Sequence, residues 1–266
     1  MSFELFAEHH GLIIRSLIED RWVRVPTTDH PHKRNGTYIY QGDSGAVRNW
    51  AVHEKPISWR GEGAIVDYES IRRKREAHAK EIAQKQRNAA RKAAWIMKQA
   101  KKETHPYLAK KGFEEDKSWV WDGVLAVPMR VNGSIVGCQL IKADGDKKFL
   151  FGQRTKDATA VFDNKGKEIL CEGYATALSI RRALKTVRTR YKLIVCFSAA
   201  NILSVAKEHT SAILVADTDP TGLSVAERSG LPFWNSDIDG EDFNDYEVRV
   251  GPIVAGETLL NVISGR

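Results

Sequence analysis

The chain has 266 residues, of which 42% are hydrophobic and 28% charged, and its formal net charge is +7. This balance predicts a folded protein with a sizeable core, in two small domains or one large one, and excludes an intrinsically disordered chain. The three cysteines are widely spaced and form no CxxC pair, which indicates neither a zinc nor a disulfide framework and suits a reducing cytosol. The N-terminus lacks the pattern of a signal peptide and no apolar stretch is long enough to span a bilayer, so we expect no membrane partner.

Residues 1–67 predict a small N-terminal α+β module. The first twenty residues have the apolar spacing of one short amphipathic helix, and the rest is rich in turn residues and aromatic side chains. We expect a small β-meander there, whose aromatic residues would usually form the core. Stacking on nucleic-acid bases is the alternative for Tyr38 and Trp50, and for Trp119 and Trp121 later in the chain.

The segment 68–103 contains neither glycine nor proline and is rich in Ala, Lys, Arg, Glu and Gln, which predicts one long helix. Its twelve Lys and Arg against four Glu give it a net charge of +8, the surplus of the whole chain. The first half has few large apolar residues and should lie in solvent, whereas Ala93, Ile96 and Met97 should dock the second half. Either the helix is a solvated link between two domains, or it is a track for a nucleic-acid backbone that begins with Arg72, Arg73, Lys74 and Arg75.

Downstream of this helix the pattern changes twice. Residues 104–167 alternate apolar and polar positions, and the turns Asn132-Gly133 and Asp144-Gly145 predict a β-rich subdomain built from hairpins. From residue 168 onward, strands alternate with helices, and the strands at 168–172, 192–197 and 212–216 are continuous apolar runs. Such runs are typical of a parallel sheet with helices on both faces, so residues 168–266 should form a Rossmann-like α/β domain.

Acidic residues end the expected parallel strands. Glu172 closes the strand 168–172, and Asp217 and Asp219 follow the strand 212–216. Because functional groups gather at the carboxyl ends of strands in such sheets, these carboxylates should converge. Each alone would more often be a helix cap or a turn residue, but together they would repel one another unless a hard cation such as Mg²⁺ or Mn²⁺ is bound. A later acidic cluster offers further ligands in Asp242 and Asp245.

Three motifs carry a family resemblance. Residues 172–179 read EGYATALS, residues 215–222 read VADTDPTG and residues 241–246 read EDFNDY, with βα units between them. Together they resemble the toprim domain of phage and plasmid primases, and residues 105–113 and 127–152 resemble the segment that precedes this domain. Residues 21–63 resemble the N-terminal module of such primases only weakly, and they contain no cysteine, so we expect no structural zinc.

The resemblance implies a DNA primase that joins nucleoside triphosphates on a single-stranded DNA template during phage or plasmid replication, in the cytosol of a bacterial host. It assigns Glu172 as general acid/base or shared metal ligand, and Asp217 and Asp219 as ligands of the catalytic Mg²⁺ or Mn²⁺. Asp242 or Asp245 would add a ligand or an outer contact. Candidates for contacting the triphosphate and the template are Arg130, Lys142, Lys147 and Lys148, although Lys147 equally suits the guarding of a strand edge.

Two other functions fit the same residues. A toprim-type nuclease would use the acids to cleave, and a non-catalytic single-stranded DNA-binding replication protein would keep only the fold. The retention of all three acidic clusters disfavours the second alternative. No GxxxxGK[ST] motif occurs, so an ATPase is not expected within this sequence and a separate replicative helicase is the expected partner.

Overall fold

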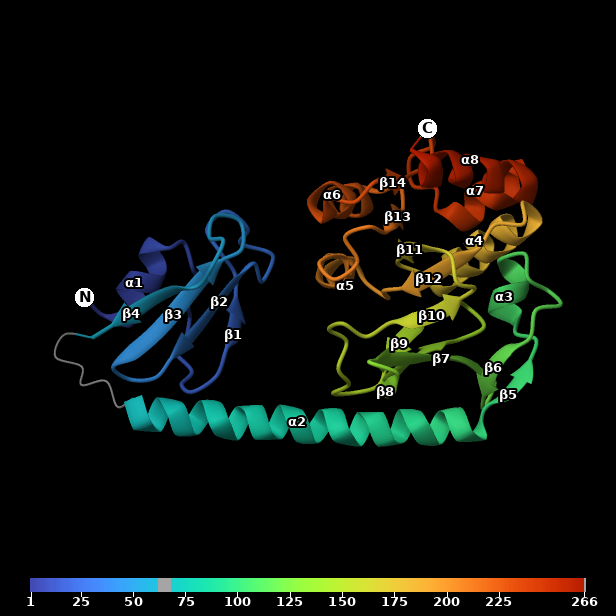
Figure 1. Ribbon diagram of the computed structural model, residues 1–266. Coiled ribbons are helices and arrows are strands. Elements are labelled where there is room, and N and C mark those ends of the chain that lie inside the picture. Colours follow the sequence, from blue (N-terminus) through green and yellow to red (C-terminus); the bar gives the residue numbers. More distant parts are fainter. Residues whose placement is uncertain (62–67, 266) are drawn as a thin grey trace. The chain divides into compact units, whose positions relative to one another are not determined.

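The structure is a computed structural model that describes residues 1–61 and 68–265 (Figure 1). The chain forms two compact units, Met1–Glu76 and Ala77–Arg266, and the division falls inside the longest helix, α2 (Tyr68–Gln99). The sequence predicts the boundary between the N-terminal module and this helix between residues 67 and 68. Residues 62–67, which precede that boundary, lie outside the described residues. In the part of the chain that is described, no helix is both long and apolar enough to cross a membrane.

Unit 1 is an antiparallel meander with one short helix. Its strands follow one another in the order β1-β2-β3-β4, and the helix α1 begins after Ser2, whose side chain accepts a hydrogen bond from the Leu5 amide. This is the arrangement that the turn-rich sequence predicts. The elements are α1 (Phe3–His9), β1 (Val23–Val25), β2 (Gly36–Tyr40), β3 (Ser44–Asn49) and β4 (Ile57–Arg60).

Phe3 of α1 anchors the core of this unit. It is buried against Tyr38 and Val47, and Gly45 makes room for it, because a Cβ on Gly45 would lie 2.4 Å from the Phe3 ring. Tyr38 is fully buried, and its hydroxyl accepts from the Ile18 amide and donates to the Ser16 carbonyl. Tyr38 is therefore a core residue, and the base-stacking alternative is wrong for this position.

The second half of α2 packs on an antiparallel sheet of unit 2, as its apolar spacing predicts (Figure 1). Ala93 and Ile96 are fully buried, in a cluster with Ala126 and Cys138 of that sheet. The helix ends four residues before the expected limit, because Lys101–Glu103 instead pair with the next strand. The strand order is β5 (Lys101–Glu103), β6 (Ser118–Trp121), β7 (Val124–Val131), β8 (Ser134–Ile141) and β9 (Lys147–Phe149), with the short helix α3 (Pro106–Lys110) between β5 and β6.

A second sheet of unit 2 has the order β10-β12-β11-β13-β14, in which β10 alone is antiparallel to its neighbour. Three of the parallel strands, β11, β12 and β13, are those predicted from the apolar runs, whereas the parallel strand β14 was not predicted and β10 comes from the preceding β-rich segment. The strands are β10 (Ala160–Asp163), β11 (Lys167–Cys171), β12 (Tyr191–Val195), β13 (Ile213–Val215) and β14 (Phe233–Trp234). The helices are α4 (Tyr174–Thr186), α5 (Ala199–Ala206), α6 (Pro220–Ser229), α7 (Phe243–Val250) and α8 (Pro252–Ser264).

Helices cover both faces of this sheet. Ile169 and Leu193 belong to the core shared with α4 and α8, whereas the next residues along the strands, Leu170 and Ile194, belong to the core shared with α5 and α6. Figure 1 shows α4, α7 and α8 on one side and α5 and α6 on the other. Burial on both faces explains the continuous apolar runs in the sequence. The carboxyl ends of the strands remain free to carry polar groups.

Candidate functional site: an acidic edge of the parallel sheet

Glu172 and Asp217 leave the parallel sheet side by side. The strands β11 and β13 are direct neighbours, with Cys171 opposite Val215, and the two acids follow these residues by one and two positions. The expected convergence of carboxylates at this edge is thus built into the register of two adjacent strands.

Asp217 lies in an environment that disfavours a free charge. Burial raises the pKa of its carboxyl to about 6, and the negative charges of Asp242, Glu172 and Asp219 add to this effect. Its Oδ1 atom is buried and has no hydrogen-bond partner among the described residues. Burial also raises the pKa of Glu172, with the charge of Asp219 as the second cause. A cation bound here would give the buried oxygen a partner and would reduce the repulsion between the neighbouring carboxylates.

The loop after β13 depends on Asp219 and Gly222. Asp219 caps α6, and its Oδ1 accepts a hydrogen bond of 2.6 Å from the Gly222 amide. A Cβ on Gly222 would lie 2.1 Å from the backbone oxygen of Asp217. Glycine is therefore required here by the close approach of backbone to backbone, which fixes how Asp217 leaves the sheet.

Asp242 and Asp245 have a partner that the sequence motifs did not assign. Asp242 caps α7, and the Nζ atom of Lys111 lies 3.6 Å from Asp242 and 3.4 Å from Asp245. The sequence signal that could have pointed to Lys111 is its place in the segment 105–113, which resembles primases. The two acids are thus engaged in ion pairs in this structure, although the charge of Asp242 still acts on Asp217.

The carboxylates at this edge suit a cation that takes some of its ligands from the protein and the others from a bound substrate. Among the described residues, no group of three or more His, Cys, Asp or Glu is arranged so that it could hold a metal ion. Magnesium commonly takes one or two carboxylates together with water and substrate phosphates. Asp217, with its unpartnered oxygen, and Glu172 and Asp219, whose charges act on it, suit that kind of binding.

The four basic candidates of the β-rich segment have different surroundings. The positive charge of Lys147 lowers the pKa values of both Glu172 and Asp217, against the effect of burial. Lys142 and Lys148 instead form ion pairs of 3.3 and 3.2 Å with Asp146. Of these four candidates, Lys147 is therefore the one whose charge acts on Glu172 and Asp217. Arg130, the fourth candidate, donates a hydrogen bond of 2.7 Å from its Nη1 atom to the Gly133 carbonyl in the adjacent turn.

The basic residues at the start of α2 are highly exposed, and most are paired. Arg72 and Arg73 lie 3.9 and 3.1 Å from Glu69, and Lys74 lies 3.1 Å from Asp20. Exposed pairs of this kind contribute little to stability and exchange readily for other anions. Their geometry is therefore compatible with both alternatives, the solvated link and the nucleic-acid track.

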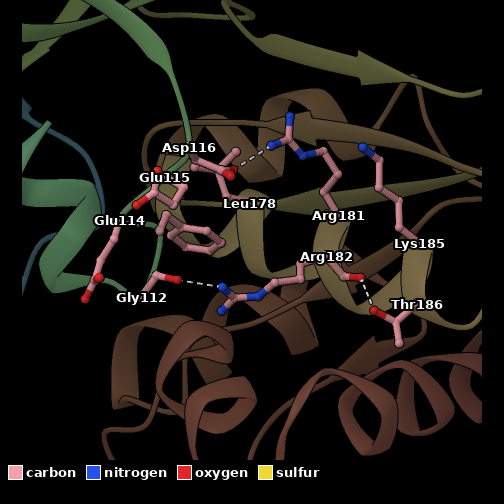
Figure 2. Close-up of a pocket in the computed structure, with 10 residues that line it drawn as sticks. Gly112, Glu114, Glu115, Asp116, Leu178, Arg181, Arg182, Lys185 and Thr186 are labelled. Atoms are coloured by element: carbon pink, nitrogen blue, oxygen red, sulfur yellow. Dashed lines mark hydrogen bonds and ion pairs between the residues drawn. The ribbon is translucent and has the colours of Figure 1, made fainter. Parts of the chain in front are cut away.

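Arg182 ties α4, which begins directly after the acidic edge, to two other segments. Its guanidinium donates to both carboxylate oxygens of the buried Glu247 in α7 and to the Gly112 carbonyl, and it stacks 4.2 Å from the Phe113 ring centroid. Gly112 and Arg182 both line a pocket of about 550 Å³. Figure 2 shows the Arg182 guanidinium directed at the Gly112 carbonyl. In that pocket Arg181 pairs with Asp116 at 3.1 Å.

These contacts fix α7 and hence the position of Asp242, which caps it. The Asn244 side chain adds hydrogen bonds of 2.9 Å to the Ser179 hydroxyl and to the Lys111 carbonyl. Nothing in the sequence distinguished Arg182 and Glu247 from the solvated charges of an amphipathic helix. Only the packing of α4 against α7 reveals them as an ion pair, in which Glu247 is buried and Arg182 is half-buried.

An α/β fold with a carboxylate cluster at the carboxyl edge of its parallel strands is the class that these observations define. No protein-family description matches the sequence, and no curated protein matches it either. Solved structures with a similar fold include the primase fragment of the bacteriophage T7 primase-helicase protein, at 19% identity and a TM-score of 0.40. The match covers 59% of this chain and 69% of that one.

Two other similar structures are also primases. The primase domains in a complex with the T7 lagging-strand DNA polymerase, an RNA/DNA hybrid and dTTP show 18% identity and a TM-score of 0.42, over 62% of this chain and 92% of that one. The zinc-binding and RNA polymerase domains of Aquifex aeolicus primase show 14% identity and a TM-score of 0.37, over 64% of this chain and 45% of that one. At these values the likeness concerns the fold alone, and the chemistry has to follow from the side chains of this chain.

Proposed function

We propose that the chain is a DNA primase, which synthesises short RNA primers on single-stranded DNA by metal-dependent nucleotidyl transfer. The observation that carries the proposal is Asp217, with a buried unpartnered oxygen and a raised pKa beside Glu172 and Asp219. The motifs EGYATALS, VADTDPTG and EDFNDY support the toprim type. The replication of a phage or plasmid in a bacterial host, with a separate helicase, is the setting that this type implies.

The residues at the acidic edge would have three roles: metal binding, proton transfer and attraction of the triphosphate. Asp217, Asp219 and Glu172 would hold Mg²⁺ or Mn²⁺, which when bound lowers the pKa of an attacking 3′-hydroxyl and neutralises the leaving pyrophosphate. Glu172, whose pKa is raised by burial, is the candidate for the general acid/base. Lys147 attracts the triphosphate to the same edge, because it is the cation whose charge acts on both acids.

The test is an incubation of the protein with single-stranded DNA, labelled nucleoside triphosphates and Mg²⁺ or Mn²⁺. Short labelled oligomers are the expected product. Asp217→Asn should abolish them while leaving the circular-dichroism spectrum unchanged. Asp239→Asn, which removes one charge from an exposed position in the loop before α7, is the matched control and should retain activity.

The same assay separates the alternatives. Shortened template without labelled oligomers would identify a nuclease, and neither product under both metals would leave a single-stranded DNA-binding protein. Full activity of Asp217→Asn would contradict the assignment of the metal site, whatever the product.

A further inference from the structure

The segment that follows α3 is held in place by two helices. Arg182 of α4 donates a hydrogen bond of 2.6 Å from its Nη1 atom to the Gly112 carbonyl, and its guanidinium carbon lies 4.2 Å from the Phe113 ring centroid. Asn244 of α7 donates a hydrogen bond of 2.9 Å from its Nδ2 atom to the Lys111 carbonyl. Three consecutive residues therefore owe their positions to two side chains that are far apart in the sequence.

The same two side chains join α4 to α7. The Nδ2 atom of Asn244 also donates to the Ser179 hydroxyl at 2.9 Å, so both of its N–H groups are used. The Arg182 guanidinium donates to both carboxylate oxygens of Glu247. Asn244 and Glu247 are 1% exposed, and Ser179 is fully buried. A buried polar network that is satisfied in this way is rigid, because another arrangement would leave a buried group without a partner.

The contacts of Arg182 and Asn244 decide where the charged groups of Lys111 and Asp242 lie. Asn244 holds the backbone of Lys111, whose Nζ atom lies 3.6 Å from Asp242. Asp242 caps α7, and its negative charge is one of those that raise the pKa of Asp217. A shift of α7 or of the segment after α3 would therefore change the charges that surround Asp217.

Stability alone does not require an arginine at position 182. A buried ion pair contributes little net stability compared with apolar side chains of similar size, because desolvation of the charges offsets their attraction. An arginine instead supplies several donors in one rigid plane, so that two acceptors bound to it take a fixed direction relative to each other. Arg182 uses this plane for the Glu247 carboxylate and the Gly112 carbonyl. Its contacts are therefore suited to orienting α7 against the segment after α3.

We propose that Arg182 and Asn244 are positioning residues: they orient Lys111 and α7 so that Asp242 keeps its place beside Asp217 when a divalent cation binds at the acidic edge. This inference rests on the metal site of the proposed function and assigns a role to two residues outside the carboxylate cluster. Removal of a residue that orients metal ligands typically weakens metal binding roughly 10- to 100-fold. A residue that serves folding alone would leave the affinity of the folded protein unchanged.

The experiment titrates the whole chain with Mn²⁺ and measures the free ion by electron paramagnetic resonance, with urea unfolding of each variant alongside. Arg182→Met and Asn244→Ala should each weaken Mn²⁺ binding roughly tenfold or more. Lys192→Met is the matched control, because it removes the cation of an ion pair of 2.8 Å with Glu168 at the amino ends of β11 and β12. Its Mn²⁺ affinity should equal that of the wild type.

A double variant separates positioning from folding. Arg182→Met combined with Glu247→Leu replaces the ion pair with apolar side chains, and it should regain the stability that Arg182→Met loses by leaving Glu247 unpaired. Its Mn²⁺ affinity should stay low, because the Gly112 carbonyl is still not held. An affinity that recovers together with the stability would overturn the proposal.

Wild-type Mn²⁺ affinity in Asn244→Ala would also overturn the proposal, as would a wild type that binds no Mn²⁺. If Asn244→Ala does not fold, Ser179→Ala removes only the hydroxyl that Asn244 binds, and the same criterion applies to it with a smaller expected loss. A wild type that binds Mn²⁺ but makes no primers would refute the proposed function. Weakened Mn²⁺ binding in the variants would still support the positioning role in that case.

Discussion

At the scale of single residues, the buried carboxyl of Asp217 should make the stability of the protein depend on pH. Its folded pKa of about 6 lies above the ordinary value of 3.8 for this carboxyl, so the folded state holds this proton more tightly than the unfolded chain does. The stability contributed by the protonated form is present below about pH 4 and is lost as the pH rises through 6. Glu172, with its raised pKa, acts in the same direction.

We therefore expect Asp217→Asn to be more stable than the wild type at pH 7 without divalent cations, by about 1–2 kcal/mol after allowance for solvent screening. Urea unfolding in chelator between pH 4 and 8 measures the difference, which should vanish at the acid end. Millimolar Mg²⁺ should then raise the stability of the wild type alone. Parallel pH profiles for the two proteins would contradict the burial of this carboxylate.

Gly222 provides a second residue-scale prediction. Gly222→Ala should displace the backbone of Asp217, because its Cβ would lie 2.1 Å from the Asp217 oxygen, and primer synthesis and Mg²⁺-induced stabilisation should both be lost. Gly173→Ala is the control. Its Cβ would meet only the Thr176 side chain, with the hydroxyl oxygen at 3.0 Å, so a milder effect is expected. Equal loss in both variants would show that the close approach at Gly222 has no special role.

At the scale of elements, α2 is the helix for which two roles compete. Its second half is fixed by Ala93 and Ile96 in the core, whereas its first half carries exposed ion pairs. If the first half follows a DNA backbone, replacing Arg72, Arg73, Lys74 and Arg75 with Ala should flatten the dependence of log affinity on log salt by roughly 0.7 for each phosphate that is no longer neutralised. An unchanged slope in an anisotropy titration would leave α2 as a solvated link.

At the scale of the whole molecule, two units with separate cores should unfold separately. Phe3→Ala should lower the midpoint temperature of one calorimetric transition, and Leu193→Ala that of the other. Each shift should correspond to a loss of about 2–5 kcal/mol in the free energy of unfolding. Both side chains are buried, at 1% and 0% exposure. One transition that both variants shift together would mean that the units fold as one cooperative body.

The sequence by itself determined the elements whose pattern is local. The continuous apolar runs predicted β11, β12 and β13 to within two residues, since a strand buried on both faces has to be apolar throughout. The absence of Gly and Pro predicted α2, and the acids directly after the strands predicted the edge at which Glu172 and Asp217 meet.

Tertiary structure alone decided which polar and aromatic groups meet across the sequence. Lys111 pairs with Asp242, and Arg182 with Glu247, over separations of more than sixty residues that no periodic pattern encodes. Tyr38 and Trp50 look alike in the sequence, yet one lies in the core and the other is exposed. The reason is that local patterns fix which way a side chain points from its own strand or helix, whereas burial and charge pairing depend on what packs against that face.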